Sequence, residues 1–424
     1  MKQTYSGGKI INSGGFGCIF KPALKCENAT NRVDNNITKL MTNKHAQEEY
    51  DLIQKIKNDL HHIPNYQNYF FVEGFTMCKP DKLTKDDLHK YDKKCKPLKK
   101  KGITSTTIND SLNDISALNM PYGGTNIDTF IKDNFVSSKI IHLNNSLIDL
   151  LIHGILPMNK SNIFHCDIKP ANVLVKPNET ILMPRLIDWG LSVKIVNNDT
   201  IPKKLYRRPL QYNVPFSSIL FNHELINRYK DFLKVNREPD DYQLKEFITN
   251  YIFIWMEIRG PGHIDSINEI IEALTISSLT SIKDTKIKQD IVKYSFTYHY
   301  IIEYLFKILK KYTQNGKLNL STYFYTVFLK NIDIWGLVTI YISLLEYVYN
   351  NVKEINYYQE QFINKIKYIT IHFLYECPTE PINTNELINE LTSLNSIIKQ
   401  FNYISVKTKI KRRITNNKTK KNKK

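Results

Sequence analysis

The periodicity of the apolar residues changes near residue 127, and this change restricts the folds that the chain can adopt. Residues 9–80 alternate apolar and polar positions like short strands, with one helical stretch at 45–56. From about residue 127 to 406, most apolar residues follow the 3.6-residue period of helices. Because strands and helices occupy separate parts of the sequence, we predict an α+β protein with a small β-rich part and a large, mostly helical part.

The expected domains follow this division. We place a β-rich domain with one main helix at 1–122 and a helical domain at 123–406. A stretch at about 79–114 is rich in Lys, Asp and Thr and lacks apolar periodicity, which indicates an inserted loop or a short helical excursion. In the second domain, Pro, Gly and Asn indicate helix breaks at 237–241, 259–263, 314–317 and 377–384.

Much of the positive charge lies at one end of the chain. The formal net charge is +18, and the last 18 residues, 407–424, hold ten Lys or Arg and no acidic residue. Without them the net charge is +8. We interpret 407–424 as a basic, disordered tail, and two interpretations of it stay open: contact with nucleic acid or another polyanion, or a solvated tail without a specific partner.

Cysteine spacing and hydropathy bear on the cellular location. The six cysteines form no CxxC pair and no Cys/His group with zinc spacing, which argues against a structural metal and favours a reducing compartment. The N-terminus lacks the apolar core of a signal peptide, and the apolar run at 334–345 is too short to span a membrane. We therefore expect a soluble, intracellular protein without a membrane span.

The stretch HCDIKPANVL, residues 165–174, combines an acid, a base and an amide at fixed spacing. Asp167 can accept a proton from a hydroxyl, Lys169 can neutralise a phosphoryl group in transfer, and Asn172 can bind a metal ion. Asp188 follows an apolar strand in LIDWG. Its carboxylate could hold a Mg²⁺ ion that bridges phosphates, because this ion prefers oxygen ligands.

Two further features near the N-terminus suggest phosphate binding. The stretch INSGGFGCIF, residues 11–20, is rich in glycine, which lets backbone N–H groups approach phosphate oxygens, although a hairpin turn is the commoner explanation of such a stretch. Lys39 lies in a strand-like run and Glu49 in the following helical stretch. A lysine held by a helix carboxylate can orient nucleotide phosphates, and we prefer Glu49 to Glu48 because its side of the helix carries the apolar residues.

This ordered set resembles the eukaryotic protein kinase family, and in particular the divergent kinases of large DNA viruses. The matching features are the Gly-rich loop with Gly14 and Gly17, the strand lysine Lys39, the helix glutamate Glu49, HxDxKxxN at 165–172, DWG at 188–190, and a DxW-containing helix at Asp333 and Trp335 that anchors the catalytic loop in that family. The resemblance covers residues 9–216 well and about 325–400 loosely. It implies a bilobal, protein-kinase-like fold and, if the protein is viral, a location in the host cytoplasm or the virion.

The resemblance also implies an activity and its site. It implies a serine/threonine protein kinase that transfers the γ-phosphoryl group of ATP to protein hydroxyls with Mg²⁺. Asp167 and Lys169 would be catalytic, and Asn172 and Asp188 would bind the metal. The residues implied at the nucleotide are Ile11, Asn12, Gly14, Gly15, Phe16, Gly17, Ile19, Lys39, Glu49, Met120, Tyr122, Asp128 and Leu174. Met120 would be the gatekeeper, and the backbone of Pro-Tyr-Gly around Tyr122 would bind adenine.

Three departures from the family pattern limit what the resemblance implies. Asn12 replaces the first glycine of GxGxxG. Cys166 replaces the arginine that, in most regulated members, binds a phosphate on the segment after DWG, so control by phosphorylation of that segment is not expected. NVPF at 213–216 stands in place of APE, and a helical insertion at about 217–325 follows.

Two other functions remain open from the sequence. One is a pseudokinase scaffold that binds nucleotide without turnover, which the altered glycine loop and the missing APE favour. The other is a small-molecule kinase of related fold, which shares HxDxxxxN. The physiological substrate and the oligomeric state are not predicted by any feature of the sequence.

Deletion of residues 407–424 tests the interpretation of the basic tail. Because the deletion removes ten positive charges and no predicted site residue, we expect weaker binding to polyanions and unchanged turnover of a small peptide. Filter binding to a nucleic acid and a peptide phosphorylation assay measure the two quantities. An equal fall in both would place the tail near the active site instead.

Overall fold

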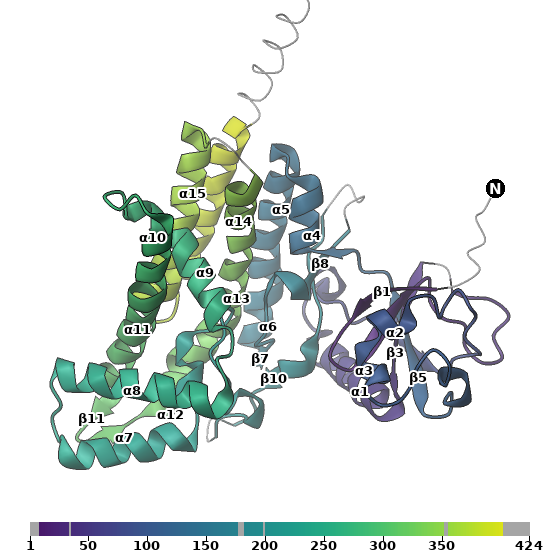
Figure 1. Ribbon diagram of the computed structural model, residues 1–424, viewed down its shortest axis with the longest axis horizontal. Helices are drawn as coiled ribbons and strands as arrows, with labels where there is room; N and C mark the ends of the chain where they lie inside the picture. Colours follow the sequence, from purple (N-terminus) through teal and green to yellow (C-terminus); the bar gives the residue numbers. More distant parts are fainter. Residues whose placement is uncertain (1–7, 34, 177–181, 198–199, 352–354, 402–424) are drawn as a thin grey trace, which may run out of the picture. The chain divides into compact units, whose positions relative to one another are not determined.

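The computed structural model describes residues 8–33, 35–176, 182–197, 200–351 and 355–401, and the predicted tail at 407–424 lies outside this part. The chain divides into two compact units, Met1–Gly124 and Thr125–Lys424. A small antiparallel sheet forms the centre of the first unit, and helices dominate the second (Figure 1). The prediction of a mixed α+β chain with its strands first is confirmed.

The N-terminal unit is built on a five-stranded antiparallel sheet with the order β1-β2-β3-β5-β4. The strands are β1 (Lys9–Ser13), β2 (Gly17–Lys21), β3 (Asn36–Thr42), β4 (Thr76–Cys78) and β5 (Ile115–Pro121). Helix α1 (Asn43–Leu60) follows β3 directly and contains the predicted stretch at 45–56. Its buried residues Ala46, Ile53, Ile56 and Leu60 recur at helical spacing, which gives α1 one apolar face for the sheet.

Residues 79–114 fold onto this sheet. They contain the short helices α2 (Tyr91–Lys94) and α3 (Lys96–Lys99), so the predicted helical excursion is present. The weak apolar periodicity was misleading, because this stretch contributes several residues to a core shared with β1 and β2. These residues are Leu83, Tyr91, Cys95, Leu98, Ile103 and Ile108. The core positions are spread over turns and very short helices, so no single period relates them.

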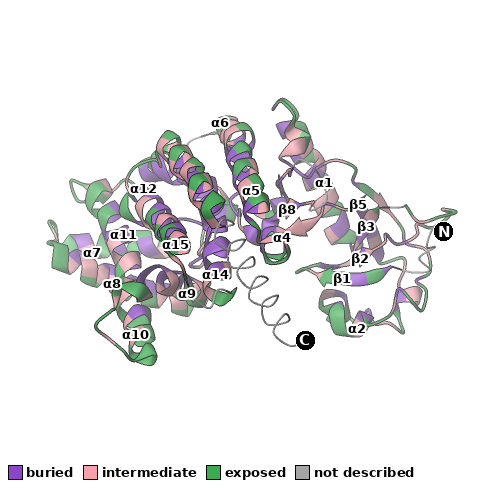
Figure 2. Ribbon diagram, turned by 90° about the horizontal axis from the view of Figure 1, so that it is seen from above, coloured by how far each residue is buried: buried purple, intermediate pink, exposed green. Residues whose placement is uncertain are grey.

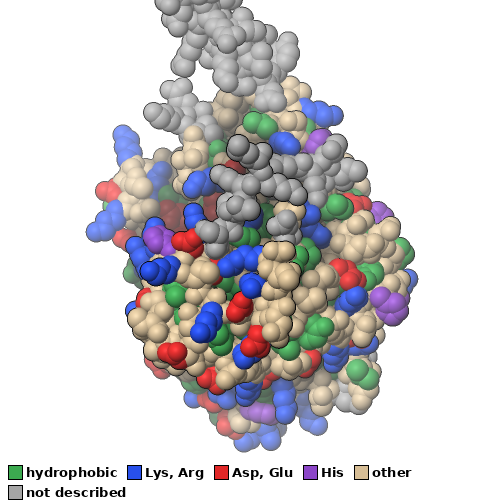
Figure 3. Space-filling model, turned by 90° about the vertical axis from the view of Figure 1, so that its right-hand side faces the viewer, with side chains coloured by type: hydrophobic (Ala, Val, Ile, Leu, Met, Phe, Trp, Pro, Cys, Tyr) green, Lys and Arg blue, Asp and Glu red, His purple; other side chains and the backbone are tan. Residues whose placement is uncertain are grey.

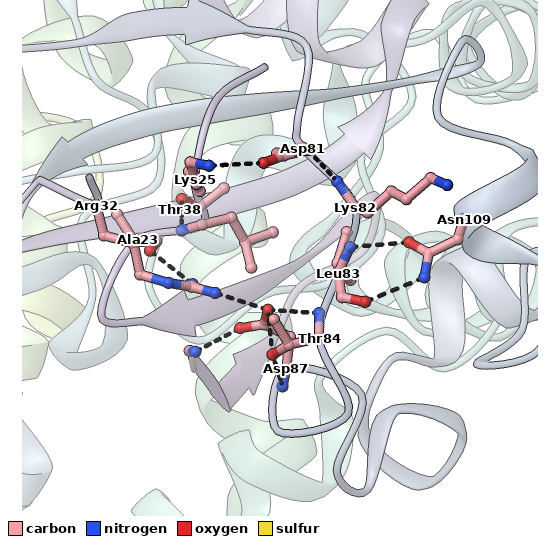
Figure 4. Close-up of polar contacts among 12 residues, drawn as sticks. Ala23, Lys25, Arg32, Thr38, Asp81, Lys82, Leu83, Thr84, Asp87 and Asn109 are labelled. Atoms are coloured by element: carbon pink, nitrogen blue, oxygen red, sulfur yellow. Dashed lines mark hydrogen bonds and ion pairs between the residues drawn. The ribbon is translucent and has the colours of Figure 1, made fainter. Parts of the chain in front are cut away.

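The carboxylate of Asp87 connects residues 79–114 to the first strands (Figure 4). It is 1% exposed and accepts hydrogen bonds from Arg32 Nη2 at 2.7 Å and from the backbone N–H of Thr84 at 2.9 Å. Arg32 Nη1 in turn donates to the carbonyl of Ala23 at 3.0 Å. A buried carboxylate is stable only with such partners, so Asp87 favours one position of the insertion.

Two disulfides form in this unit, and Cys18–Cys95 joins residues 79–114 to the sheet. Cys18 on β2 is bonded to Cys95 with a Cα–Cα distance of 5.4 Å, and Cys26 is bonded to Cys78 with a Cα–Cα distance of 5.8 Å. Of the six cysteines, Cys166 and Cys377 are free. Disulfides persist in oxidising environments, so this pairing runs against the reducing compartment expected from the spacing. Sequence spacing did not reveal it, because the partners are 77 and 52 residues apart.

The C-terminal unit combines two small sheets near its start with a large set of helices. Strands β6 (Thr125–Asn126), β8 (Val173–Val175) and β9 (Arg185–Leu186) form one sheet, and β7 (Ile163–Phe164) pairs with β10 (Val193–Lys194). The helices begin with α4 (Ile127–Asn134), α5 (Ser137–Asp149) and α6 (Leu156–Lys160). The stretch HCDIKPANVL runs from the end of β7 into β8, so a loop between two short strands carries it.

Residues 217–325 are largely helical, as predicted. They contain α7 (His223–Val235), α8 (Asp241–Arg259), α9 (Ile264–Thr275), α10 (Thr285–Ile291), α11 (Thr297–Tyr312) and the hairpin β11 (Thr313–Gln314) and β12 (Lys317–Leu318). The breaks predicted at 237–241, 259–263 and 314–317 fall between these elements. Exposed and partly exposed residues cover the outer sides of α7, α8 and α10 (Figure 2).

Helix α13 (Leu329–Ile340) is the core of this unit. Nearly all its residues are buried, and it packs against β7 and against α14 (Ile342–Asn351) and α15 (Tyr357–Thr370). Within the described residues, the helical runs Ser137–Lys160 and Leu320–Asn351 are long and apolar enough for a membrane span. In the second run 94% of the most apolar window is buried, which is typical of a core helix and compatible with the predicted lack of a span.

The two disulfides predict a specific thiol count. In unreduced, denatured protein we expect two alkylated cysteines, Cys166 and Cys377, and after reduction six. Loss of the Cys18–Cys95 link should lower the free energy of unfolding by up to about 4 kcal/mol, because it frees a long loop in the unfolded chain. Mass spectrometry and thermal unfolding of Cys95→Ser measure both effects. Cys377→Ser is the control, and six alkylated cysteines without reductant would contradict the pairing.

Candidate active site

The side chain of Asp333 fixes the start of the loop after β7. It lies on α13, is fully buried, and accepts hydrogen bonds from the backbone N–H groups of His165 at 2.9 Å and Cys166 at 2.8 Å. Burial raises its pKa to about 6, although these two hydrogen bonds act in the opposite direction. The anchoring expected for the helix around Asp333 is therefore confirmed.

Close packing supports the same connection. A Cβ atom at Gly336 would lie 2.5 Å from the carbonyl oxygen of Ile168, so only glycine at this position lets the loop approach α13. Trp335, one residue earlier, donates from its indole nitrogen to the carbonyl of Tyr212 at 2.8 Å. Neighbouring positions of one helix thus hold both the catalytic-loop candidate and the segment after DWG.

Asp167 is the centre of a buried polar network. Its side chain has an exposed fraction of 7%. Oδ2 accepts from Lys169 Nζ at 2.7 Å and from Asn172 Nδ2 at 3.0 Å, while Oδ1 accepts from Asn213 Nδ2 at 2.9 Å. Three donors from different directions fix the orientation of the carboxylate. Asp167, Lys169 and Asn172, which the sequence singled out together, are therefore in contact.

His165 connects this network to the strand before DWG. Its Nε2 lies 2.9 Å from the carbonyl of Ile187, and its Nδ1 lies 3.3 Å from the backbone nitrogen of Asp167. Complete burial lowers its pKa, which favours a neutral ring that donates from Nε2 and accepts at Nδ1. The ring also packs on Trp189, with 4.7 Å between the centroids.

Two oxygen ligands for a cation are present in this unit. Asn172 uses its amide nitrogen for bonds to Asp167, which leaves its side-chain oxygen for a metal ion. The carboxylate of Asp188 is exposed and has no hydrogen bond or ion pair with another described residue. No group of three or more His, Cys, Asp or Glu residues forms a metal site in the described part of the chain. This donor set fits Mg²⁺, which takes few protein ligands and completes its shell with phosphate and water.

In the N-terminal unit, the expected pairing of Lys39 with Glu49 is confirmed. Lys39 Nζ on β3 lies 2.7 Å from Oε1 and 2.5 Å from Oε2 of Glu49 on α1. Glu48 lies elsewhere on the helix, within 3.3 Å of His45, and its side chain is 59% exposed. The helical period explains the difference, because adjacent residues lie about 100° apart around the helix axis.

The glycines of residues 11–20 serve different purposes. A Cβ atom at Gly17 would lie 2.6 Å from the carbonyl oxygen of Leu40, so Gly17 is required for packing against β3. Gly14 and Gly15 have no heavy atom within 4 Å of such a Cβ. The open turn at Gly14 and Gly15 is therefore the part of the loop that a phosphate could approach. Asn12, in place of the first glycine, bonds through Oδ1 to the backbone of Ser13 at 2.8 Å.

The expected nucleotide residues of this unit lie on the neighbouring strands β1, β2, β3 and β5, on the turn between β1 and β2, on α1, and directly after β5. Ile19 on β2 is the direct cross-strand neighbour of Lys39, and Met120 on β5 is buried. Phe16 is 60% exposed and packs on His45, and Ile11 is 48% exposed. Single exposed apolar residues are common on protein surfaces, so the exposure of these two side chains does not by itself indicate a ligand.

The expected hinge Pro-Tyr-Gly already makes one backbone hydrogen bond within the protein. The backbone N–H of Tyr122 donates to the carbonyl of Asn35 at 2.8 Å, so this group is already used. Pro121 has no N–H group. In the stretch Pro-Tyr-Gly, Gly123 is therefore the remaining backbone donor for an adenine ring, and the aromatic ring of Tyr122 instead contacts Lys21 Nζ at 3.1 Å from its centroid.

Asp128 and Leu174 belong to the C-terminal unit. Asp128 lies in the first turn of α4 and accepts a hydrogen bond from Ser343 Oγ at 2.7 Å, which occupies one of its oxygens. Leu174 lies on β8, between Asn126 of β6 and Arg185 of β9. Neither residue belongs to the hydrogen-bonded network around Asp167.

Asn213 is the functional candidate that the sequence did not identify. Its amide donates to Asp167 Oδ1 and, at 3.2 Å, to the carbonyl of Ile168. It lies 46 residues from Asp167, and nothing in the local sequence marks an asparagine as its partner. The only signal was its position in NVPF, the stretch in place of APE.

Phe216 shows what NVPF does structurally. It is 1% exposed and packs against Tyr304, Trp335 and Tyr375 with centroid distances of 5.3 to 5.5 Å. Aromatic packing therefore holds the end of the segment after DWG. Tyr304 belongs to α11, so the predicted insertion supplies part of this support.

On the face shown in Figure 3, Lys and Arg side chains lie among Asp and Glu side chains and form no single positive patch. The predicted basic tail at 407–424 lies outside the described residues.

No protein-family model matches this sequence, and a search of curated proteins finds no match.

The role of Asp333 can be tested with Asp333→Asn. An amide offers one acceptor where the carboxylate offers two, so one buried backbone N–H faces an NH₂ group. We expect the free energy of unfolding at pH 7 to fall by about 3 kcal/mol in chemical denaturation. Asp231→Asn, at an exposed position of α7, is the control, and an equal effect of both would contradict the anchoring role.

The difference in stability between the wild type and Asp333→Asn should depend on pH. Because burial raises the pKa of folded Asp333 to about 6, from 3.8, the folded chain binds a proton that the unfolded chain lacks between these values. The wild type should therefore gain stability relative to Asp333→Asn as the pH falls from about 6 to about 4. Denaturation at several pH values measures this gain, and a constant difference would contradict it.

Proposed function

We propose that the chain is a serine/threonine protein kinase of bilobal, protein-kinase-like fold that transfers the γ-phosphoryl group of ATP to protein hydroxyls with Mg²⁺. The observation that carries the proposal is the network around Asp167, in which Lys169, Asn172 and Asn213 bind a carboxylate on a loop fixed by Asp333. The sequence resemblance supports the assignment.

In this proposal Asp167 orients the acceptor hydroxyl and receives its proton. A carboxylate held by three donors loses little freedom when a hydroxyl binds, which is the main contribution of positioning in phosphoryl transfer. Lys169 lies beside it and balances negative charge as the phosphoryl group moves. Asn213 would hold Asp167 in place from the segment after DWG.

The N-terminal unit would bind the phosphates of ATP. Lys39 keeps its ammonium group near Glu49, which leaves it oriented and partly exposed, at 22% of its side-chain area. A lysine in this state can bind the α- and β-phosphates. The turn at Gly14 and Gly15 would offer backbone N–H groups to the same phosphates.

Mg²⁺ would neutralise charge on the phosphates of bound ATP. Asp188 and the side-chain oxygen of Asn172 would hold it. The amide nitrogen of Asn172 donates to Asp167, which fixes the orientation of the side-chain oxygen of Asn172. Asp188 has a left-handed backbone conformation, with φ at 65°, and stands two residues before Gly190.

Transfer of labelled phosphate from Mg-ATP to a mixed basic protein substrate tests the proposal. We expect phosphoserine or phosphothreonine with the wild type, and a rate at least about 1000-fold lower with Asp167→Asn or Asp188→Ala. Asp167→Asn should bind ATP with nearly unchanged affinity, because the residue contacts the hydroxyl. Asp149→Asn, an exposed position, is the control.

Two results would contradict the proposal. Wild-type rates with Asp167→Asn would remove its assignment as the catalytic base. ATP binding by the wild type without transfer to protein would favour a scaffold or a kinase with a small-molecule acceptor.

A further inference from the structure

The stretch Arg208–Asn213 binds the catalytic loop at both of its ends. The Arg208 side chain is buried, and its Nη1 donates to the carbonyl of Cys166 at 2.8 Å. At the other end, Asn213 donates to Asp167 Oδ1 and to the carbonyl of Ile168. The stretch therefore contacts three consecutive residues of the loop, and any shift of it would move Asp167.

The opposite side of this stretch is bound by the predicted insertion. Trp255, near the end of α8, is 1% exposed and donates from its indole nitrogen to the carbonyl of Arg208 at 3.0 Å. The backbone N–H of His263, just before α9, donates to the carbonyl of Leu210 at 2.8 Å. The rings of His263 and Tyr212 lie 5.5 Å apart.

Gly262 makes this contact unusually close. Its φ is +60°, and a Cβ atom there would lie 2.2 Å from the carbonyl oxygen of Leu210 and 3.0 Å from its nitrogen. No side chain fits in that space, so the backbones of the α8–α9 turn and of Leu210 touch directly. Gly260, two residues earlier, also has a positive φ of +79°, but its Cβ would meet no atom within 4 Å.

The positive charge of Arg208 also favours the position of Arg208–Asn213 beside the catalytic loop. Arginine stays protonated in proteins, and a buried cation needs compensating groups. Burial lowers the pKa of Arg208, while the nearby Asp167 and Asp333 carboxylates raise it. Arg208 also donates from Nε to Gln211 Oε1 at 2.7 Å. It thus brings a guanidinium to the backbone of Cys166, the position where the family has its phosphate-binding arginine.

We propose that the end of α8 and the α8–α9 turn of the insertion, through Trp255, Gly262 and His263, hold Arg208–Asn213 against the catalytic loop in place of a phosphate on the segment after DWG. Arg208 is then a positioning residue for Asp167. Only the predicted effect on the reaction rate rests on the proposed kinase function. Its structural part concerns the order of the stretch and of the loop, which can be measured without turnover.

Gly262→Ala and Gly260→Ala form a matched pair that tests this proposal in the full chain. Both place alanine at a positive φ, but only Gly262→Ala pushes on Leu210. Amide hydrogen exchange should become at least about tenfold faster in peptides covering 164–170 and 205–216 for Gly262→Ala than for Gly260→Ala. Equal exchange in the two variants would overturn the proposal.

Kinetics give the second readout. We expect kcat of Gly262→Ala to fall on the order of 100-fold relative to Gly260→Ala, with the KM for ATP changed less than about twofold, because Asp167 is displaced and the nucleotide residues are not. Phosphatase treatment of the wild type should leave its rate unchanged. A large loss after that treatment would overturn the proposal.

A more conservative substitution tests the proposal if Gly262→Ala does not fold. Trp255→Phe keeps an aromatic ring and removes the hydrogen bond to Arg208, so it should show the same exchange pattern at smaller amplitude. If the wild type transfers no phosphate, the proposed function fails, and the exchange comparison still decides whether the turn positions the loop. Unchanged exchange in Trp255→Phe would overturn the proposal in that case.

Discussion

The candidate site depends on the hydrogen bonds that the buried carboxylate of Asp333 accepts from the loop after β7. Two backbone N–H groups of the loop at His165 and Cys166 would have no acceptor in the core without it. A buried donor without an acceptor lowers the stability of the fold, so these two hydrogen bonds fix the loop on α13 more firmly than apolar packing would. Every further contact of Asp167 starts from a loop that is already in place.

Tryptophans hold the segment after DWG in a similar way. Trp335 and Trp255 both donate indole N–H groups to backbone carbonyls of this segment, at Tyr212 and at Arg208. A buried indole combines a large apolar surface with one directional donor, so it both packs and selects a register. Phe216 adds an aromatic cluster at the end of the segment, in the stretch NVPF.

The N-terminal unit supports its glycine-rich hairpin from outside. Residues 79–114 reach β1 and β2 through the Cys18–Cys95 disulfide and through Lys94 Nζ, which donates to the carbonyl of Ile10 at 2.7 Å. The carboxylate of Asp87 accepts from the backbone N–H of Gly8 at 2.5 Å, at the start of the same hairpin. The strands on both sides of the turn at Gly14 and Gly15 are thereby fixed, and the turn itself stays open.

The sequence by itself determined the order of strands and helices, the helix breaks, and the pairs whose partners are close in the chain or on adjacent elements, such as Lys39 with Glu49. Local periodicity and short spacing decide these features, because neighbouring residues share an element face. Only the tertiary structure decided the disulfides, the core of residues 79–114, and the partners Asn213 and Arg208 of the loop at 165–172. These contacts join residues 42 to 77 positions apart, and packing in three dimensions, which no local pattern encodes, brings them together.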